Sequence, residues 1–336
     1  YAGFAENILA LQAASCNIIV DDVSYFIESP FQDNEIAQAV ITVTNAGAMF
    51  FSSAANDGNL TSNQSATWEG DYHANDEIGG LPAGDVHDFG DGGQSHALAS
   101  AASRLVLHWT DPFYASGNDY DLYVMNNALT AVLGSSTDIQ DGTGIPWEFA
   151  FGSFNVGSRV VVFRNAGAEN RMINLLASRS RLSIATDGAT RGHSAAPLAY
   201  SVAAVPAHEA FSVGSPVGPY PNPFTVANQV ELFSSDGPRR IFFGTDGKLL
   251  PGAPEGDVSA SGGVVRQKPD IAAADGVQTS APGFDPFFGT SAAAPHAAAI
   301  AGLLQQAFPF SSTTEIRDLL QGSALDIMAP GVDPDS

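Results

Sequence analysis

The residue best placed to do chemistry in this chain is Ser291. It lies in the string Phe-Gly-Thr-Ser-Ala-Ala-Ala-Pro-His, residues 288–296, where a glycine turn leads into small residues typical of a tightly packed helix. Gly289 permits a close backbone approach, and a helix that starts here would stabilise negative charge developing beside the serine. These features suit a nucleophile. A serine that only caps a buried alanine-rich helix fits the same residues, because serine is a preferred cap.

Two aspartates form a weaker candidate site. Asp119 and Asp121 would share one face of a strand, and clustered carboxylates are ligands that Ca²⁺ prefers. A structural calcium ion could bind here, although turn hydrogen bonds at a solvated edge explain the pattern as well. The sole cysteine, Cys16, cannot form an internal disulfide and excludes cysteine-rich zinc sites. We therefore expect no required cofactor and no metal at the catalytic site.

The helices and strands expected around these residues alternate in two different patterns along the chain. The first part alternates helices with apolar strands, which is typical of a parallel sheet covered by helices. We expect a helix over 4–14, a strand over 17–23, a second helix that Asp33 caps and that ends near Gly47, and a strand over 48–53. The same pattern resumes after about residue 192, with a strand over 200–205 and a helix from Ser291.

Between these parts, short strands follow one another without helices. They are expected at 104–110, 121–125, 147–151, 159–164 and 172–177, and an acidic surface loop is expected over 69–91. Such spacing is typical of an antiparallel β-sandwich. The predicted fold is a three-layer α/β domain with a mostly parallel sheet, interrupted by this sandwich. Residues 1–65 and 192–336 would form the two parts of the α/β domain, and residues 66–191 the insertion.

The composition of the chain limits the classes of partner that it can bind. The chain has 336 residues, 44% hydrophobic and only 15% charged, with a formal net charge of −23, so it can build a core but repels phosphate backbones and anionic lipids. We expect neither nucleic acid nor a membrane as a partner. The acidic, disulfide-free composition fits a secreted or extracellular protein. The chain begins at Tyr1, so its signal region and natural N-terminus are expected to be missing.

Several segments resemble one protease family, in the family's order. Gly-Thr-Ser-x-Ala-x-Pro-His resembles the serine motif of the subtilisin-like serine proteases, or subtilases, and residues 51–58 resemble the strand and loop that carry their oxyanion asparagine. Residues 268–271, Lys-Pro-Asp-Ile, and 233–238, Phe-Ser-Ser-Asp-Gly-Pro, resemble two further subtilase segments. Residues 17–25 resemble the strand that lines the substrate cleft. The resemblance covers roughly residues 1–64 and 192–336.

The resemblance implies a serine endopeptidase that cleaves protein or peptide substrates through an acyl-enzyme. Ser291 would be the nucleophile, and the Asn56 amide would stabilise the oxyanion together with the Ser291 backbone N–H. The implied substrate-binding residues are Val23, Ser24, Tyr25, Ala54 and Ala55.

Three departures from the family pattern bear on activity. Ala55 replaces the glycine that usually precedes the oxyanion asparagine, and Ala-Ala-Ala-Asp-Gly replaces the usual Ala-Pro-Gly after Lys-Pro-Asp. Subtilases order their triad Asp, His, Ser, with both partners before the oxyanion asparagine, yet no histidine precedes Asn56 here. His296, about one turn beyond Ser291, is expected to be a core histidine. The base and its carboxylate are therefore expected upstream, outside this chain.

Three alternatives remain open. The chain could be a fragment whose N-terminal segment is removed or stays as a separate polypeptide, or a sedolisin-like Ser-Glu-Asp peptidase with its partners also upstream. It could instead be a relic whose sandwich binds protein or carbohydrate without catalysis. As it stands, we expect the chain to be inactive, with apolar surface exposed near residues 17–24, 48–54 and 199–205. Through this surface it would hold its own cleaved N-terminal segment or self-associate.

Overall fold

A four-stranded parallel sheet lies at the centre of the α/β part of the molecule. The structure, a computed structural model, describes residues 2–207, 224–226 and 228–327. The sheet contains β1 (Ile18–Asp21), β2 (Met49–Ser53), β13 (Ala199–Pro206) and β16 (Ile271–Asp275), in that order and all parallel. The two central strands, β2 and β13, are buried along almost their whole length. This burial on both faces explains why their sequences show no polar alternation.

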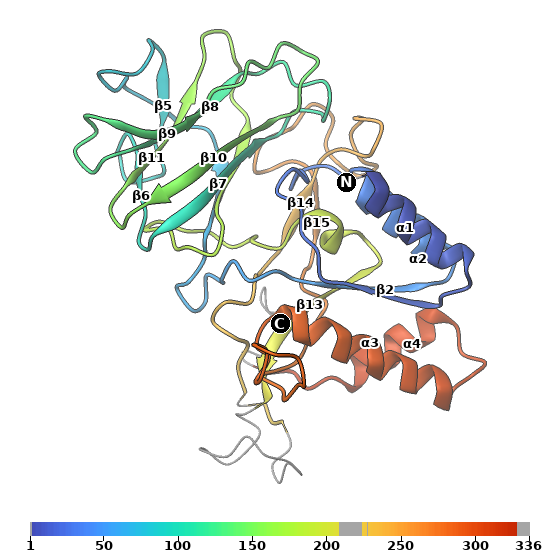
Figure 1. Cartoon of the computed structure of the whole chain (residues 1–336). Helices are drawn as coiled ribbons and strands as arrows, with labels where there is room; N and C mark the ends of the chain where they lie inside the picture. Colours follow the sequence, from blue (N-terminus) through green and yellow to red (C-terminus); the bar gives the residue numbers. More distant parts are fainter. Residues whose placement is uncertain (1, 208–223, 227, 328–336) are drawn as a thin grey trace.

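Helices cover both faces of this sheet (Figure 1). On one face, α1 (Ala2–Ala13) and α2 (Glu35–Asn45) pack against Ile19 and Phe50. On the other face, α3 (Thr290–Ala307) and α4 (Thr313–Ser323) pack against Met49 and Phe51. Since neighbouring residues of β2 point to opposite faces, one strand contributes to both cores. The predicted three-layer α/β class is confirmed.

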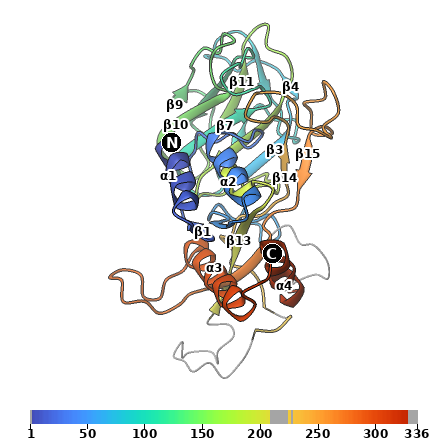
Figure 2. The same cartoon turned by 90° about the vertical axis from the view of Figure 1, so that its right-hand side faces the viewer.

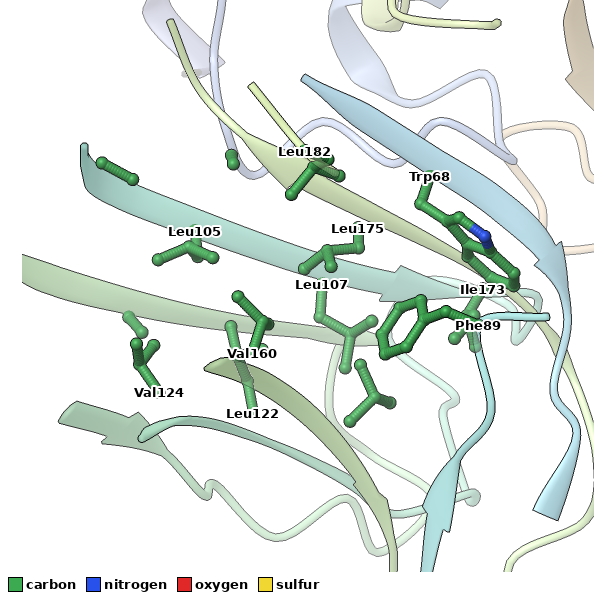
Figure 3. Packing of buried hydrophobic residues seen from close by; sticks show 14 of the residues in the cluster. Trp68, Phe89, Leu105, Leu107, Leu122, Val124, Val160, Ile173, Leu175 and Leu182 are labelled. Carbon is green, nitrogen blue, oxygen red and sulfur yellow. The ribbon is translucent and has the colours of Figure 1, made fainter. Parts of the chain in front are cut away.

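Two antiparallel sheets form the second part of the molecule, at the far end from α3 and α4 (Figure 2). One contains β10 (Trp147–Phe154), β7 (Ala102–Trp109), β12 (Met172–Ala177) and β3 (Thr67–Asp71), in that order. The other contains β4 (Ala74–Asn75), β5 (Asp85–His87), β11 (Arg159–Arg164), β8 (Tyr120–Met125) and β9 (Val132–Ser136), with β6 (His96–Ala97) paired to β11. Alternate residues of the two sheets share one core, for example Leu107 and Leu175 with Leu122 (Figure 3).

All of these antiparallel strands fall in sequence between β2 and β13, which are neighbours in the parallel sheet. Ala199 of β13 lies opposite Phe50 of β2. A buried ion pair joins the antiparallel sheets to the rest of the chain: the fully buried Arg239 of β14 (Arg239–Ile241) pairs with Glu69 on β3. The strand β14 pairs with β15 (Val264–Arg266) in a small ladder. This arrangement is consistent with an antiparallel insertion into the α/β fold, while the β-sandwich insertion and its boundaries at 65/66 and 191/192 stay predictions.

Two local predictions are wrong. Asp33 does not cap α2, because Asn34 is the N-cap and the Asp33 carboxylate binds Arg266 at 2.7 Å. Residues 69–91 are not one surface loop, since they include the end of β3 and all of β4 and β5. In both cases a partner distant in sequence determines the local structure.

The predicted apolar exposure is correct only at the sheet edge. β1 has a neighbour on one side only, and Val20 on it is 45% exposed. The predicted exposure near 48–54 and 199–205 is wrong, because β2 and β13 are central strands and are covered by helices. Among the helices of the described residues, none has the length and apolar character needed to cross a membrane.

Candidate active site

Ser291 is the second residue of α3, directly after a strained turn. Gly289 is the N-cap, with φ at 130°, a region that residues with a side chain rarely adopt. Its N–H donates to Asp275 Oδ2 at 2.8 Å, at the end of β16, and its carbonyl accepts from Ala292 N–H at 2.9 Å. The turn therefore joins the sheet edge to the helix and presents Ser291, which is half-buried, at the helix N-terminus.

Asn56 lies beside this turn, in the loop after β2. Its Oδ1 accepts hydrogen bonds from the Thr290 N–H at 3.1 Å and the Thr290 hydroxyl at 3.0 Å, which leaves the Nδ2 amide as a donor. A Cβ at Gly289 would lie 3.6 Å from Asn56 Nδ2, 3.6 Å from Ser291 N and 3.7 Å from Ser291 Cβ. Two nitrogen donors and the serine thus lie within 4 Å of one point beside Gly289. Donors placed in this way could stabilise the oxyanion of acyl transfer.

Ala55 keeps the backbone shape that a glycine would adopt more easily. Its φ is 79°, in the left-handed region, and its carbonyl accepts from Ser235 N–H at 3.0 Å. The loop therefore retains a conformation that favours glycine, at a cost of about 1–2 kcal/mol for a residue with a Cβ. The replacement noted in the sequence strains the loop that carries Asn56.

The five predicted substrate-binding residues lie around one small cavity. Val23, Ser24 and Tyr25 follow β1, while Ala54 and Ala55 follow β2, and the adjacent parallel strands bring their carboxyl ends together. The cavity behind them measures about 20 Å³, room for about one water molecule. Val23 and Ser24 are exposed. These residues form a wall that a substrate could lie against, and not a deep pocket.

A buried charged cluster that the sequence did not reveal lies behind this wall. His193, on the short helix η1 (Gly192–Ala195), places Nδ1 2.8 Å from Glu28 Oε2 and Nε2 3.2 Å from Asp21 Oδ2. Burial alone disfavours the charged ring, but the two carboxylates outweigh it and raise the pKa of His193 to about 10. The ring is therefore protonated at neutral pH with both nitrogens in use, so it cannot take a proton from Ser291.

The other histidines that the structure describes form no hydrogen bond with Ser291 either. His296 Nδ1 lies 2.7 Å from the Ala292 carbonyl of its own helix. Burial lowers the pKa of His87 to about 3 and of His96 to about 4, both inside the antiparallel part. Within residues 2–207, 224–226 and 228–327, no hydrogen bond joins a histidine to Ser291. His208 lies outside the described residues.

The two remaining subtilase-like segments support the site from below. A Cβ at Gly237 would lie 1.9 Å from the Lys268 carbonyl oxygen, so the segments meet where only glycine fits. Lys268 is buried, and its Nζ donates to the Ala199 carbonyl at 2.8 Å and pairs with Asp270 at 2.7 Å. Their role here is to hold β13 and the following loops in place.

The predicted calcium ligands lie on β8 and just before it. Tyr123 donates its hydroxyl to Asp121 Oδ2 at 3.2 Å, and burial raises the pKa of both Asp119 and Asp121. In the described part of the chain, no three His, Cys, Asp or Glu side chains cluster as a metal site would require. Calcium at these aspartates stays a prediction.

A serine at a helix N-terminus with two N–H donors beside it, on a three-layer α/β fold, defines a site suited to acyl transfer by a serine nucleophile. Residues 3–334 match the model of the subtilase family, Peptidase_S8, and the chain belongs to this family of serine proteases.

Solved structures provide more distant matches. The chain is similar to the S41 psychrophilic protease, with 15% identity and a TM-score of 0.38, over 98% of this chain and 58% of that one. It therefore spans little more than half the length of that protease. Weaker matches are a carbohydrate-binding module of Cellvibrio mixtus lichenase 5A in complex with cellotriose (18% identity, TM-score 0.17, 35% of this chain and 94% of that one) and an arabinose-bound α-L-arabinofuranosidase (12% identity, TM-score 0.19, 45% and 28%). No curated protein matches the chain.

Proposed function

We propose that this chain carries the nucleophile half of a subtilase-type serine endopeptidase. Ser291 Oγ would attack the peptide carbonyl while an external base accepts its proton. The base would return this proton to the amine as the C–N bond breaks, which leaves an acyl-enzyme that water then hydrolyses. The Asn56 amide and the Ser291 N–H would donate to the oxyanion of each tetrahedral intermediate. The observation that carries the proposal is the convergence of these two donors on the space beside Ser291.

The base and its orienting carboxylate are proposed to come from a segment of the same gene product outside these residues. Within the described part of the chain, the Ser291 hydroxyl has no hydrogen-bond partner, and His193 is held by Glu28 and Asp21. The open edge of β1 offers backbone groups with which such a segment could pair. Without it, the chain is expected to hydrolyse no peptide. As a secreted or extracellular protease, the complete protein would act on protein or peptide substrates.

A peptidase assay tests this proposal. The full-length gene product should hydrolyse a denatured protein such as casein, its Ser291→Ala variant should not, and the 336-residue chain alone should be inactive. Turnover by the isolated chain would show that a base exists within it. A full-length product that is folded but inactive would favour the non-catalytic binding module. Activity that requires an upstream Glu and Asp, with no histidine, would establish the sedolisin-like alternative.

A further inference from the structure

A second, larger cleft borders the candidate active site and shares the lining residue Asp57 with the small cavity behind Val23–Tyr25. Its volume is about 620 Å³, within the usual range for ligand-binding clefts. Asn56 and Gly289 line it at the candidate active site, while Arg179 and Arg181 line it from the segment after β12. A polypeptide with its scissile carbonyl at Ser291 would extend into this cleft on one side of that bond.

The two arginines are free to bind a ligand. Arg179 is exposed and Arg181 half-buried, and in the part of the chain that the structure describes neither guanidinium forms a hydrogen bond or ion pair. The chain has 36 acidic residues against 13 basic ones, so cations without a carboxylate partner are unexpected. The carboxylate that lines the cleft, Asp57, is 9% exposed and accepts a hydrogen bond from the Arg179 backbone, and among the described residues it forms no ion pair with either guanidinium.

The backbone that carries these arginines is fixed to the active-site loop. Arg179 N–H donates to Asp57 Oδ1 at 2.8 Å, and Asp57 N–H donates to Ser235 Oγ at 3.0 Å. Arg179 has φ at 53°, a strained value for a residue with a long side chain. On its other side, the Arg181 carbonyl accepts from Ala99 N–H at 2.8 Å. Because Asp57 directly follows Asn56, one loop positions both the oxyanion donor and the arginine turn.

We propose that Arg179 and Arg181 select substrates with an acidic side chain close to the scissile bond, on the side that enters this cleft. This inference rests on the proposed peptidase function. Guanidinium groups hold carboxylates through paired N–H donors, and such charge-assisted bonds are stronger than neutral ones. The antiparallel insertion would then contribute directly to substrate choice.

Cleavage of matched peptides by the full-length gene product tests the proposal. Peptides would carry glutamate, or the isosteric glutamine, at each position from four residues before to four residues after the scissile bond. We expect one position where glutamate is cleaved at least about tenfold faster, an effect of about 1.4 kcal/mol. The preference should weaken in 0.5 M NaCl, because salt screens exposed charges.

Variants link the preference to these residues. Arg179→Asn with Arg181→Gln should bring the glutamate-to-glutamine ratio close to one, and asparagine tolerates the left-handed turn. Arg159→Ala is the control, since it removes a positive charge from β11 at a position that does not line the cleft. Arg179→Glu with Arg181→Glu should shift the preference to lysine at the same position. An unchanged ratio in the double variants, or no acidic preference in the wild type, overturns the inference.

A binding measurement separates this inference from the proposed function. If the full-length product cleaves no peptide, the peptidase proposal fails. Fluorescence anisotropy with an alanine-rich hexapeptide carrying one central glutamate, compared with its glutamine counterpart, then decides the inference on the same protein. Tighter binding of the glutamate peptide that disappears in the Arg179→Asn, Arg181→Gln variant supports the cleft as an acidic-peptide site. Equal binding of the two peptides contradicts it.

Discussion

Replacing Ala55 with glycine should change the stability of the fold little, whereas the same change at its neighbour Ala54 should lower it. Ala55 has φ at 79°, and relief of this strain should return about 1–2 kcal/mol. Against this, glycine adds freedom to the unfolded chain, worth about 0.4–1 kcal/mol. Loss of a half-buried methyl costs about 0.4 kcal/mol, half the value for full burial. The Ala55→Gly variant should therefore lie between about 0.4 kcal/mol less stable and about 1.2 kcal/mol more stable than the wild type.

Ala54→Gly is the matched control. Ala54 is 1% exposed, has no positive φ, and donates its N–H to the Val202 carbonyl at 3.0 Å. The variant gains the same unfolded-state freedom but relieves no strain and loses a fully buried methyl, so it should lose about 1–2 kcal/mol.

Urea unfolding followed by far-UV circular dichroism measures both effects under the same conditions. The free energies of unfolding of the two variants should differ by at least about 1 kcal/mol, with Ala55→Gly the more stable. Equal destabilisation of the two would show that the turn before Asn56 is not strained, and the description of the oxyanion loop would be wrong.

Three further predictions concern protonation and catalysis. Burial lowers the pKa of His87 to about 3 and of His96 to about 4, against about 6.5 in the unfolded chain. The free energy of unfolding should therefore fall as the pH drops from 6.5 toward 4. Urea titrations at each pH should show a shallower fall for a His87→Gln variant. The pKa of His193 is raised to about 10, so its contribution to the free energy of unfolding is complete below pH 6.5 and is lost as the pH rises toward 10. His193→Gln should remove this alkaline dependence of stability. An unchanged dependence in the variant would argue against the ion cluster of His193 with Glu28 and Asp21. Asn56→Asp keeps an oxygen to accept from Thr290 but loses the amide donor, so kcat of the full-length product should fall about 10²–10³-fold, whereas an undiminished kcat would exclude the oxyanion role.

Local sequence patterns predicted the elements well where burial is continuous. The apolar run in β2 indicated a parallel strand buried on both faces, although not its central place in the sheet. The turn at Gly289 and the alanines that follow Ser291 predicted the start of α3 within one residue. In both segments the local residues alone determine the secondary structure, so a short stretch of sequence is enough to predict it.

Features that depend on distant partners were not predictable. Asp33 looked like a helix cap because its partner, Arg266, lies 233 residues away in the chain. The Glu28–His193–Asp21 cluster escaped notice for the same reason, since Glu28 and His193 are 165 residues apart. The order of strands in the sheet also determined which segments are exposed: β13 returns beside β2 after the whole antiparallel insertion, and it buries residues that were expected at an edge.

Covalent labelling of the serine tests the central claim most directly. The full-length gene product would be treated with a fluorophosphonate probe, digested, and mapped by tandem mass spectrometry, with heat-denatured protein and Ser291→Ala as controls. We predict a single adduct on Ser291 that appears only in the folded wild type, because only an activated serine beside the oxyanion donors reacts. No adduct on folded protein, or an adduct on another serine such as Ser194, would contradict the assignment of Ser291 as the nucleophile.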